Sequence, residues 1–344
     1  MHLNITQKHI QTGLLLIVIN AVAILTGCKP ETKVESPEVP EEAEVKVQAI
    51  PSFNSDSCYK FIAEQVALGK RVPNTKAHDA CTQYLVKKLE QYGLKVTQQK
   101  GVVTAYDGTK LNITNIIAIV NPDAKKRILL SAHYDTRPFN DQDVKPDHIA
   151  IDGANDGGSG VAVILEIARL AQIDNPEVGL YILLNDAEDY GVPSFESEKK
   201  QGNADSYCLG TQFWAKKLDK SAFTANYGIV LDMVGGKNAK FFQEGNSREK
   251  AADIVTKVWN AAGDAGHRQH FIQIPTGGIT DDHEYINSLA GIPCIDIIDF
   301  DENREKGFPD SWHTVADNMS NIDKLTLRAV GETVTRVIYT ESPK

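Results

Sequence analysis

Acids and histidines recur directly after short apolar runs of this sequence. His133 and Asp135 stand in "SAHYDTRP", Glu188 and Asp189 in "LLNDAEDYG", and Asp232 in "IVLDMVGG". A carboxylate after an apolar run is costly unless a cation or a hydrogen-bond network receives it. Carboxylate oxygens and imidazole nitrogens are zinc ligands, and a catalytic zinc site uses three of them plus an open position. The pattern therefore favours a metal site over the alternative, a purely structural polar network.

Three further features refine this interpretation. Glu188 and Asp189 are adjacent, and neighbouring residues of an extended chain point to opposite sides, so we expect these carboxylates to do different jobs. Asp156, in "GANDGGSGVAVILEIA", precedes a helical pattern, and a helix N-cap is the alternative to a ligand role there. His313, in "FPDSWHTVADN", would on its own be more typical of a structural histidine.

The elements that must position these residues alternate between strand and helix. Short runs rich in Ile, Val and Leu predict strands covered on both faces at 112–120, 127–135, 178–186, 227–235 and 293–300. Helical spacing predicts helices at 56–70, 76–92, 159–172, 210–218, 248–263 and 321–340. This alternation predicts a single α/β domain with a central, twisted, mostly parallel mixed sheet flanked by helices on both faces. Ligands of such sheets bind beyond the carboxyl ends of the strands, which is where the acids and histidines fall.

Composition and the N-terminal region bear on location. The chain has 344 residues and a formal net charge of −10, which argues against nucleic acid as a partner. Lys8 precedes "TGLLLIVINAVAILTGC", an apolar stretch too short for a comfortable membrane span. The following segment is rich in Glu and Pro and lacks aromatic residues, so it cannot bury a core and is predicted to be a solvated tether.

The end of the apolar stretch, Leu25-Thr26-Gly27-Cys28, resembles the lipobox of bacterial lipoproteins. We therefore expect a signal peptide over 1–27, a lipid on Cys28, a tether over 28–50 and a catalytic domain over 51–344. The protein would be exported and anchored to a bacterial membrane, facing the periplasm or the cell surface. The alternative is an ordinary N-terminal anchor helix in which the cysteine is accidental.

Four cysteines remain beyond this segment, and export permits disulfides. Cys58 and Cys81 fall on two predicted neighbouring helices and could pair. Cys294, inside an apolar run, is predicted to be a small buried hydrophobe. No CxxC spacing occurs, so a thiolate zinc site is not indicated.

The order of the motifs is more specific than any one of them. The chain resembles the zinc-dependent aminopeptidase-like superfamily over residues 55 to 340. The resemblance lies in the order of six motifs: HxD, GANDxxSG, an acidic pair after an apolar strand, LDM, DDH and WHT. Within it, the chain resembles the animal-type glutaminyl cyclases. "TDDHEYI" has two aspartates before the histidine, and "SWHTVADN" has a tryptophan before the metal histidine, where the peptidases usually have tyrosine.

The resemblance implies one zinc ion per chain, bound by Asp156, Asp189 and His313, with Glu188 as the general acid/base. Many members of the family have Glu-Glu where this chain has Glu188-Asp189, so the shorter Asp189 must approach the metal differently.

The resemblance also implies roles around that centre. Asp232 and Asp282 match the carboxylates of a hydrogen-bond network with the catalytic acid. Trp312 matches a wall of the substrate pocket, and Tyr207 and Trp214 are further candidates for that pocket. His133 and Asp232 match the second metal position of the two-zinc peptidases, and we keep His133 and Asp135 as a second-metal or hydrogen-bond position.

The expected activity is therefore conversion of the N-terminal glutamine of peptides or proteins to pyroglutamate, with release of ammonia. One alternative is a two-zinc aminopeptidase, since all five residues that would bind its two metals are present. The other is a non-catalytic binding domain on a lipidated tether. Zinc content separates the first two, because about one ion per chain is expected for the cyclase and about two for the peptidase.

Overall fold

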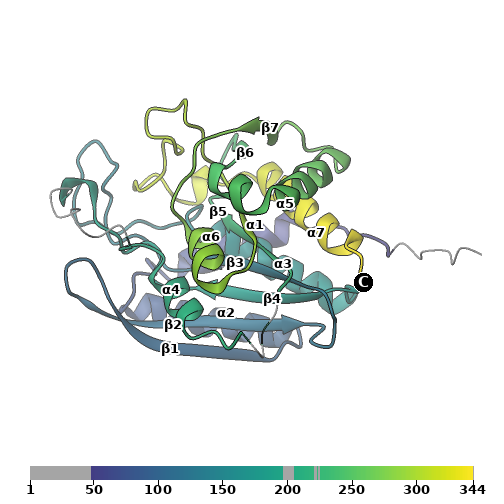
Figure 1. Ribbon diagram of the computed structural model, residues 1–344. Coiled ribbons are helices and arrows are strands. Elements are labelled where there is room, and N and C mark those ends of the chain that lie inside the picture. The colour runs from purple at the N-terminus through teal and green to yellow at the C-terminus, as the bar shows by residue number, and fades with distance from the viewer. Residues whose placement is uncertain (1–47, 197–204, 221–222, 224, 344) are drawn as a thin grey trace, which may run out of the picture. The chain divides into compact units, whose positions relative to one another are not determined.

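The computed structural model describes residues 48–196, 205–220, 223 and 225–343, drawn in colour in Figure 1. The expected signal peptide and the expected tether up to residue 47 lie outside these ranges. None of the helices within the ranges combines the length and the apolar content that a membrane span requires.

Six strands form the central sheet, in the order β1-β2-β4-β3-β5-β8. Four of them run parallel to their neighbours, namely β3 (Arg127–His133), β4 (Gly179–Asn185), β5 (Tyr227–Asp232) and β8 (Cys294–Ile298). β2 (Lys110–Val120) pairs antiparallel with β4, and β1 (Val96–Thr104) closes the edge antiparallel to β2. The predicted mostly parallel mixed sheet is confirmed. β1 was missed because an edge strand keeps alternate residues exposed and so lacks the continuous apolar run of the inner strands.

Helices cover both faces of this sheet, as predicted (Figure 1). One face carries α1 (Ser55–Ala67), α2 (Lys76–Gln91), α3 (Gly158–Ile173) and α7 (Lys324–Thr340), and α5 (Gly245–Asp264) packs against α7 and β8. The other carries α4 (Leu209–Lys216), α6 (Asp282–Tyr285) and the π-helical turn Ile286–Ala290. Beside them, β6 (Phe241–Gln243) and β7 (Phe271–Pro275) form a small parallel pair, and Met319–Asn321 is a 3₁₀ turn.

Alternation along β3 separates two of the hydrophobic clusters of the core. Ile128 and Leu130 belong to the larger hydrophobic cluster beneath α1, α3 and α7, whereas Leu129 belongs to a smaller cluster beneath α4 and the π-helical turn. Both faces of the inner strands are therefore buried, which explains their uninterrupted apolar sequences.

The carboxyl ends of the parallel strands meet at one edge. His133 at the end of β3 is in register with Asn185 at the end of β4, and Asp232 at the end of β5 is in register with Ile298 on β8. The side chains that follow these strands are thereby gathered at one rim.

The suggested pairing of Cys58 with Cys81 is wrong. Among the described residues all four cysteines are free, and these two are fully buried in the larger cluster. α1 packs mainly on α3 and α7, whereas α2 packs on β2, and α1 and α2 are joined by contacts of Tyr84 and Lys88 with Glu64 rather than by a disulfide.

Candidate active site

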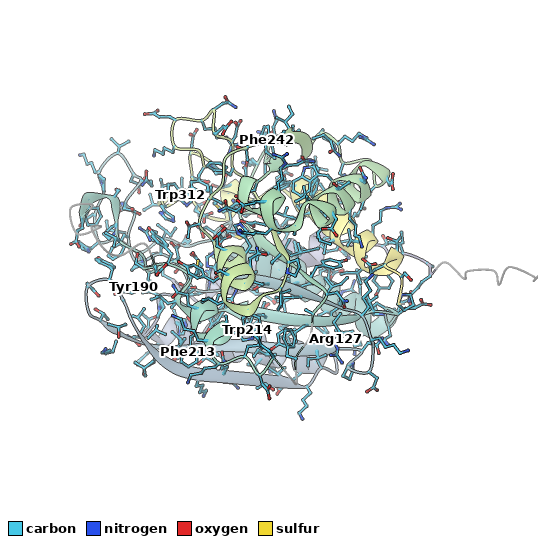
Figure 2. All side chains as sticks on the ribbon, viewed as in Figure 1. Arg127, Tyr190, Phe213, Trp214, Phe242 and Trp312 are labelled. Carbon is cyan, nitrogen blue, oxygen red and sulfur yellow. The ribbon has the colours of Figure 1, made fainter. Side chains whose placement is uncertain are left out.

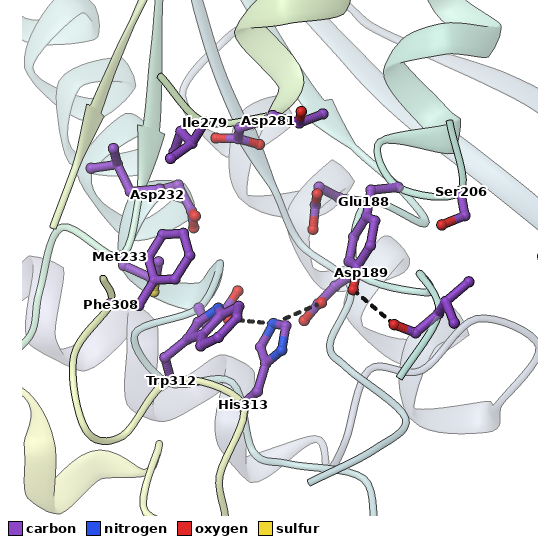
Figure 3. Close-up of a pocket in the computed structure, with 15 residues that line it drawn as sticks. Glu188, Asp189, Ser206, Asp232, Met233, Ile279, Asp281, Phe308, Trp312 and His313 are labelled. Atoms are coloured by element: carbon purple, nitrogen blue, oxygen red, sulfur yellow. Dashed lines mark hydrogen bonds and ion pairs between the residues drawn. The ribbon is translucent and has the colours of Figure 1, made fainter. Parts of the chain in front are cut away.

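Three side chains from separate segments converge at the rim of the sheet. His313 Nε2 lies 3.2 Å from Asp189 Oδ1 and 3.7 Å from Asp156 Oδ2, and all three residues are buried (Figure 3). Oδ2 of Asp189 is buried and has no hydrogen-bond partner among the described groups. Two carboxylates and one imidazole beside a cavity are the donor set of a catalytic zinc centre, so these residues fit a zinc ion.

A second cluster shares Asp156. His133 Nε2 lies 3.0 Å from Asp156 Oδ1 and 3.3 Å from Asp232 Oδ1. Gly157 packs directly against the histidine, because a Cβ at this position would lie 2.3 Å from the His133 carbonyl oxygen and 2.5 Å from its Nε2. The glycine that follows Asp156 therefore allows the close approach of the two segments.

Hydrogen bonds to the backbone hold the two loops in place. The backbone N–H groups of Asn155 and Asp156 donate to the carboxylate of Asp317, at 2.8 and 3.0 Å. The N-cap of α3 is Gly157, which removes the N-cap alternative for Asp156.

Asp135 holds the other loop. It is fully buried and accepts hydrogen bonds from the backbone N–H groups of Glu188 and Asp189, at 3.0 and 3.2 Å, and its Oδ1 lies 3.5 Å from His133 Nδ1. Of the two roles considered for Asp135, the geometry supports the hydrogen-bond position.

The two neighbouring acids do not lie on an extended chain. β4 ends at Asn185, and Ala187 adopts a left-handed conformation with φ of 50°, so Glu188 and Asp189 both line the same cavity. Their surroundings nevertheless differ. Asp189 contacts His313, whereas the Glu188 carboxylate lies between Asp281 and that pair (Figure 3). Burial and the neighbouring acids raise the pKa of Glu188 well above its usual value, against the lowering effect of His133.

Asp282 lies behind the cavity wall, and among the described residues it makes no direct hydrogen bond to Glu188, although its charge contributes to the raised pKa of Glu188. Asp281 is the N-cap of α6 and lines the cavity, whereas Asp282 is buried behind it and accepts a hydrogen bond from Asn185 Nδ2 at 2.8 Å. Asp281 is still in an extended conformation, with φ of −152° and ψ of −178°, whereas Asp282 is the first helical residue, so the two neighbouring side chains point in different directions. Asp281 is therefore the carboxylate that accompanies Glu188 and Asp232 at the cavity wall.

The cavity itself has a volume of about 610 Å³ and is walled largely by apolar and aromatic side chains: Val192, Tyr207, Met233, Ile279, Ile298, Phe308 and Trp312. The indole of Trp312 stacks on the His313 ring, with centroids 4.0 Å apart, and contacts Phe308. Trp312 and Tyr207 thus lie where the sequence placed them. A cavity of this size suits a small ligand or the end of a chain.

Trp214 is not part of this cavity, and its expected place there is wrong. It is 1% exposed, packs against Tyr181 and Phe223 in the smaller core cluster, and donates a hydrogen bond from Nε1 to the Tyr181 hydroxyl at 3.3 Å. Figure 2 shows it well apart from Trp312. The residue lies on the inner face of α4, which is turned toward the sheet.

Comparison with known proteins identifies the family. The family model described as peptidase family M28 matches residues 115–338, which contain every strand and loop that carries the two clusters. The chain belongs to peptidase family M28.

Solved M28 relatives carry two kinds of name. A Zn-dependent exopeptidase from Parabacteroides distasonis is 52% identical, with a TM-score of 0.82, and the match covers 85% of this chain and all of that one. A Bacteroides thetaiotaomicron glutaminyl cyclase bound to N-acetylhistamine is 51% identical, with a TM-score of 0.82, and the match covers 86% of this chain and all of that one.

Curated relatives are more distant and are named in the same two ways. The aminopeptidase YwaD of Bacillus subtilis is 27% identical over 261 residues, which is 72% of this chain and 49% of the relative. The M28 chain therefore spans about half the length of that relative. Glutaminyl-peptide cyclotransferases also match, at 23 to 27% identity. The resemblance to zinc aminopeptidase-like proteins and to glutaminyl cyclases is thus confirmed, and the family and the candidate metal clusters agree in suggesting zinc.

The M28 site contains an ion pair that the sequence analysis missed. Arg137 is fully buried, binds both oxygens of Asp141 at 2.7 and 3.1 Å, and lies 3.2 Å from Asp189 Oδ1. Asp141 Oδ1 in turn lies 3.3 Å from His313 Nδ1, so the ring presents Nε2 to Asp156 and Asp189. Although burial opposes its charge, contacts with His313 and Arg137 lower the pKa of Asp141 well below its ordinary value. "TRPFND", directly after the HxD motif, was the available signal.

Replacing Arg137 by Leu is expected to lower the free energy of unfolding by about 3–5 kcal/mol, because two buried carboxylates lose their cation. Urea denaturation followed by tryptophan fluorescence measures this. Arg328→Leu is the matched control, since Arg328 pairs with Glu332 at the surface and its loss should cost less than about 1 kcal/mol. If Arg137→Leu lowered the free energy of unfolding by as little as Arg328→Leu, the buried ion pair would not be what stabilises the site.

Proposed function

We propose that this protein is a zinc-dependent glutaminyl-peptide cyclotransferase that converts the N-terminal glutamine of peptides or proteins to pyroglutamate and releases ammonia. The observation that carries the proposal is the position of Glu188 beside the Asp156–Asp189–His313 cluster, in the lining of a largely apolar cavity. The 51% identical glutaminyl cyclase, which the chain covers over its full length, supports it.

The chain's own groups supply what ring closure needs. The cavity walls select a folded-back glutamine side chain and exclude water, which brings the α-amine close to the side-chain amide carbonyl. An α-amine has an ordinary pKa of about 7.7–8.0, so a neutral fraction exists near pH 8. Glu188 accepts a proton from the attacking nitrogen and delivers it to the departing amide nitrogen, which leaves as ammonia. Burial and the like charges of Asp189, Asp281 and Asp282 raise the pKa of Glu188, so that it holds the proton in transit more readily than a free glutamate would.

A zinc ion held by Asp156, Asp189 and His313 would polarise the amide carbonyl as a Lewis acid. The nucleophile belongs to the substrate, so the reaction requires no metal-activated water. One zinc ion per chain is therefore sufficient for the proposed chemistry.

A two-zinc aminopeptidase is the second candidate. The His133–Asp156–Asp232 cluster favours it, because a second ion there would share Asp156 with the first. The exopeptidase and aminopeptidase names among the relatives favour it as well.

Two measurements on the purified protein separate these candidates. With a glutamine-initiated dipeptide we expect ammonia and a blocked N-terminus, and elemental analysis should find about one zinc per chain. A leucine-initiated dipeptide and heat-treated protein are the controls for peptidase activity and for uncatalysed cyclisation. Release of free glutamine or leucine, with about two zinc ions per chain, would establish the peptidase instead.

The location is part of the proposal. Cleavage before Cys28, lipidation of that cysteine and the acidic segment behind it would place the cavity at a bacterial membrane surface, facing the periplasm or the exterior. Exported peptides and proteins that begin with glutamine would then be the substrates.

A further inference from the structure

Cys208 directly contacts the proposed acid/base. Its Sγ lies 3.2 Å from Glu188 Oε1 and 4.0 Å from Asp281 Oδ1, and the residue is fully buried. Among the described residues, no other group donates a hydrogen bond to the Glu188 carboxylate. Within the described residues, the Cys208 thiol is therefore the one hydrogen-bond donor that restrains the carboxylate of Glu188.

The backbone around Cys208 is fixed against the loop that carries Glu188. The N–H of Cys208 donates to the carbonyl of Glu188 at 2.9 Å, and the N–H of Leu209 donates to the carbonyl of Ala187 at 3.1 Å. Gly210 packs on the same loop, since a Cβ there would lie 2.0 Å from the Asp186 carbonyl oxygen. These contacts set the distance between the thiol and the carboxylate independently of the side chains themselves.

The conformation of Cys208 turns its side chain toward that loop. The residue is the N-cap of α4 and adopts a left-handed conformation, with φ of 54°. An N-cap side chain ordinarily accepts a hydrogen bond from the first turn of its helix. Within the described chain this one makes no such bond, and its sulfur points to Glu188 instead.

The chemistry of the group favours donation over metal binding. Glu188, Cys208 and Asp281 offer ligand atoms within 4.8 Å of one another. Burial and the adjacent carboxylates, however, raise the pKa of the Cys208 thiol well above its usual value. A protonated thiol donates a hydrogen bond and is a poor metal ligand.

We propose that Cys208 is a positioning residue, whose S–H donates to Oε1 of Glu188 and orients the carboxylate so that Oε2 faces the substrate nitrogen. This inference rests on the proposed function of Glu188. The thiol proton stays on sulfur throughout, and Oε2 alone takes up and releases the proton in transit. Cys208 thus affects the chemical step without touching the substrate.

Turnover of a glutamine-initiated dipeptide tests the proposal in the purified full-length protein. Cys208→Ala should lower kcat about tenfold and leave KM within about twofold, because it removes one hydrogen bond to a charged group that acts in the chemical step. Cys208→Ser should stay within about threefold of the unmodified protein, since its hydroxyl also donates. Cys58→Ala, which removes another fully buried thiol, is the matched control and should leave kcat unchanged.

A double-mutant cycle with Glu188→Gln shows whether the effect passes through Glu188. In that background, Cys208→Ala should change the residual kcat by less than about twofold. The inference would be overturned by a tenfold loss of kcat on adding Cys208→Ala to Glu188→Gln, or by an unchanged kcat in the single Cys208→Ala variant. It would also be overturned if Cys208→Ser were as slow as Cys208→Ala, or if either Cys208 variant lost its zinc. If the single Glu188→Gln variant keeps normal turnover, the result rules out the proposed function of Glu188 and not the contact with Cys208.

Discussion

Replacing Glu188 by Gln should lower kcat for a glutamine-initiated dipeptide by about 10²–10⁴-fold, the range that general acid/base groups contribute. Glutamine has nearly the same shape but cannot carry the proton from the attacking amine to the leaving nitrogen. KM should change little, because the cavity walls around Val192 and Trp312 are untouched. Steady-state release of ammonia measures both parameters.

The fold and the metal content should survive this change. The backbone N–H of Glu188 is held by Asp135, and the three candidate zinc ligands are other residues. Elemental analysis and circular dichroism check this directly. Glu249→Gln, on the exposed surface of α5, is the matched control and should behave like the unmodified protein. A Glu188→Gln enzyme within a few-fold of normal turnover would remove Glu188 from the mechanism.

The second large effect is expected at Asp156, the carboxylate that belongs to both metal clusters. Asp156→Asn should reduce bound zinc to near zero and lower turnover by about 10³-fold or more, because a Lewis acid contributes several kcal/mol to such a step. The substitution nearly preserves the shape of the side chain. Elemental analysis after gel filtration and the dipeptide assay are the measurements.

The fold should tolerate Asp156→Asn, so a loss of zinc in this variant can be assigned to the missing ligand and not to unfolding. Asp317 accepts hydrogen bonds from backbone N–H groups at 155 and 156, and these do not depend on the charge of the side chain. Asp152→Asn, on the same loop but partly exposed and paired with Lys70, is the matched control and should keep zinc and activity. Full zinc content in Asp156→Asn would mean that the metal binds elsewhere.

Much of the fold could be predicted because local sequence is enough for an inner strand. Strands such as β3 and β5, buried on both faces, have sequences that are apolar almost without interruption, and the intervening helices show their own spacing. β1 lacked that signal because its alternate residues are exposed at the sheet edge. The grouping of Asp156, Asp189 and His313 came from the resemblance of their motifs to a known family, since His313 on its own is more typical of a structural histidine.

The details of the site depended on contacts between distant segments. Whether Asp281 or Asp282 faces the cavity is set by the rotation of α6, and the burial of Trp214 is set by which side of α4 meets the sheet. No local pattern encodes the approach of Cys208 to Glu188, which are 20 residues apart.

The sequence by itself therefore determined the order of the inner strands and of the long helices, the family resemblance and the residue types available at the rim of the sheet. Only the tertiary structure decided which of those side chains share a cavity, which support them from behind and which are core. The physical reason is that hydrophobic periodicity is a local property of the chain, whereas the direction of a side chain at the end of a strand or helix is set by packing and hydrogen bonds between segments far apart in sequence.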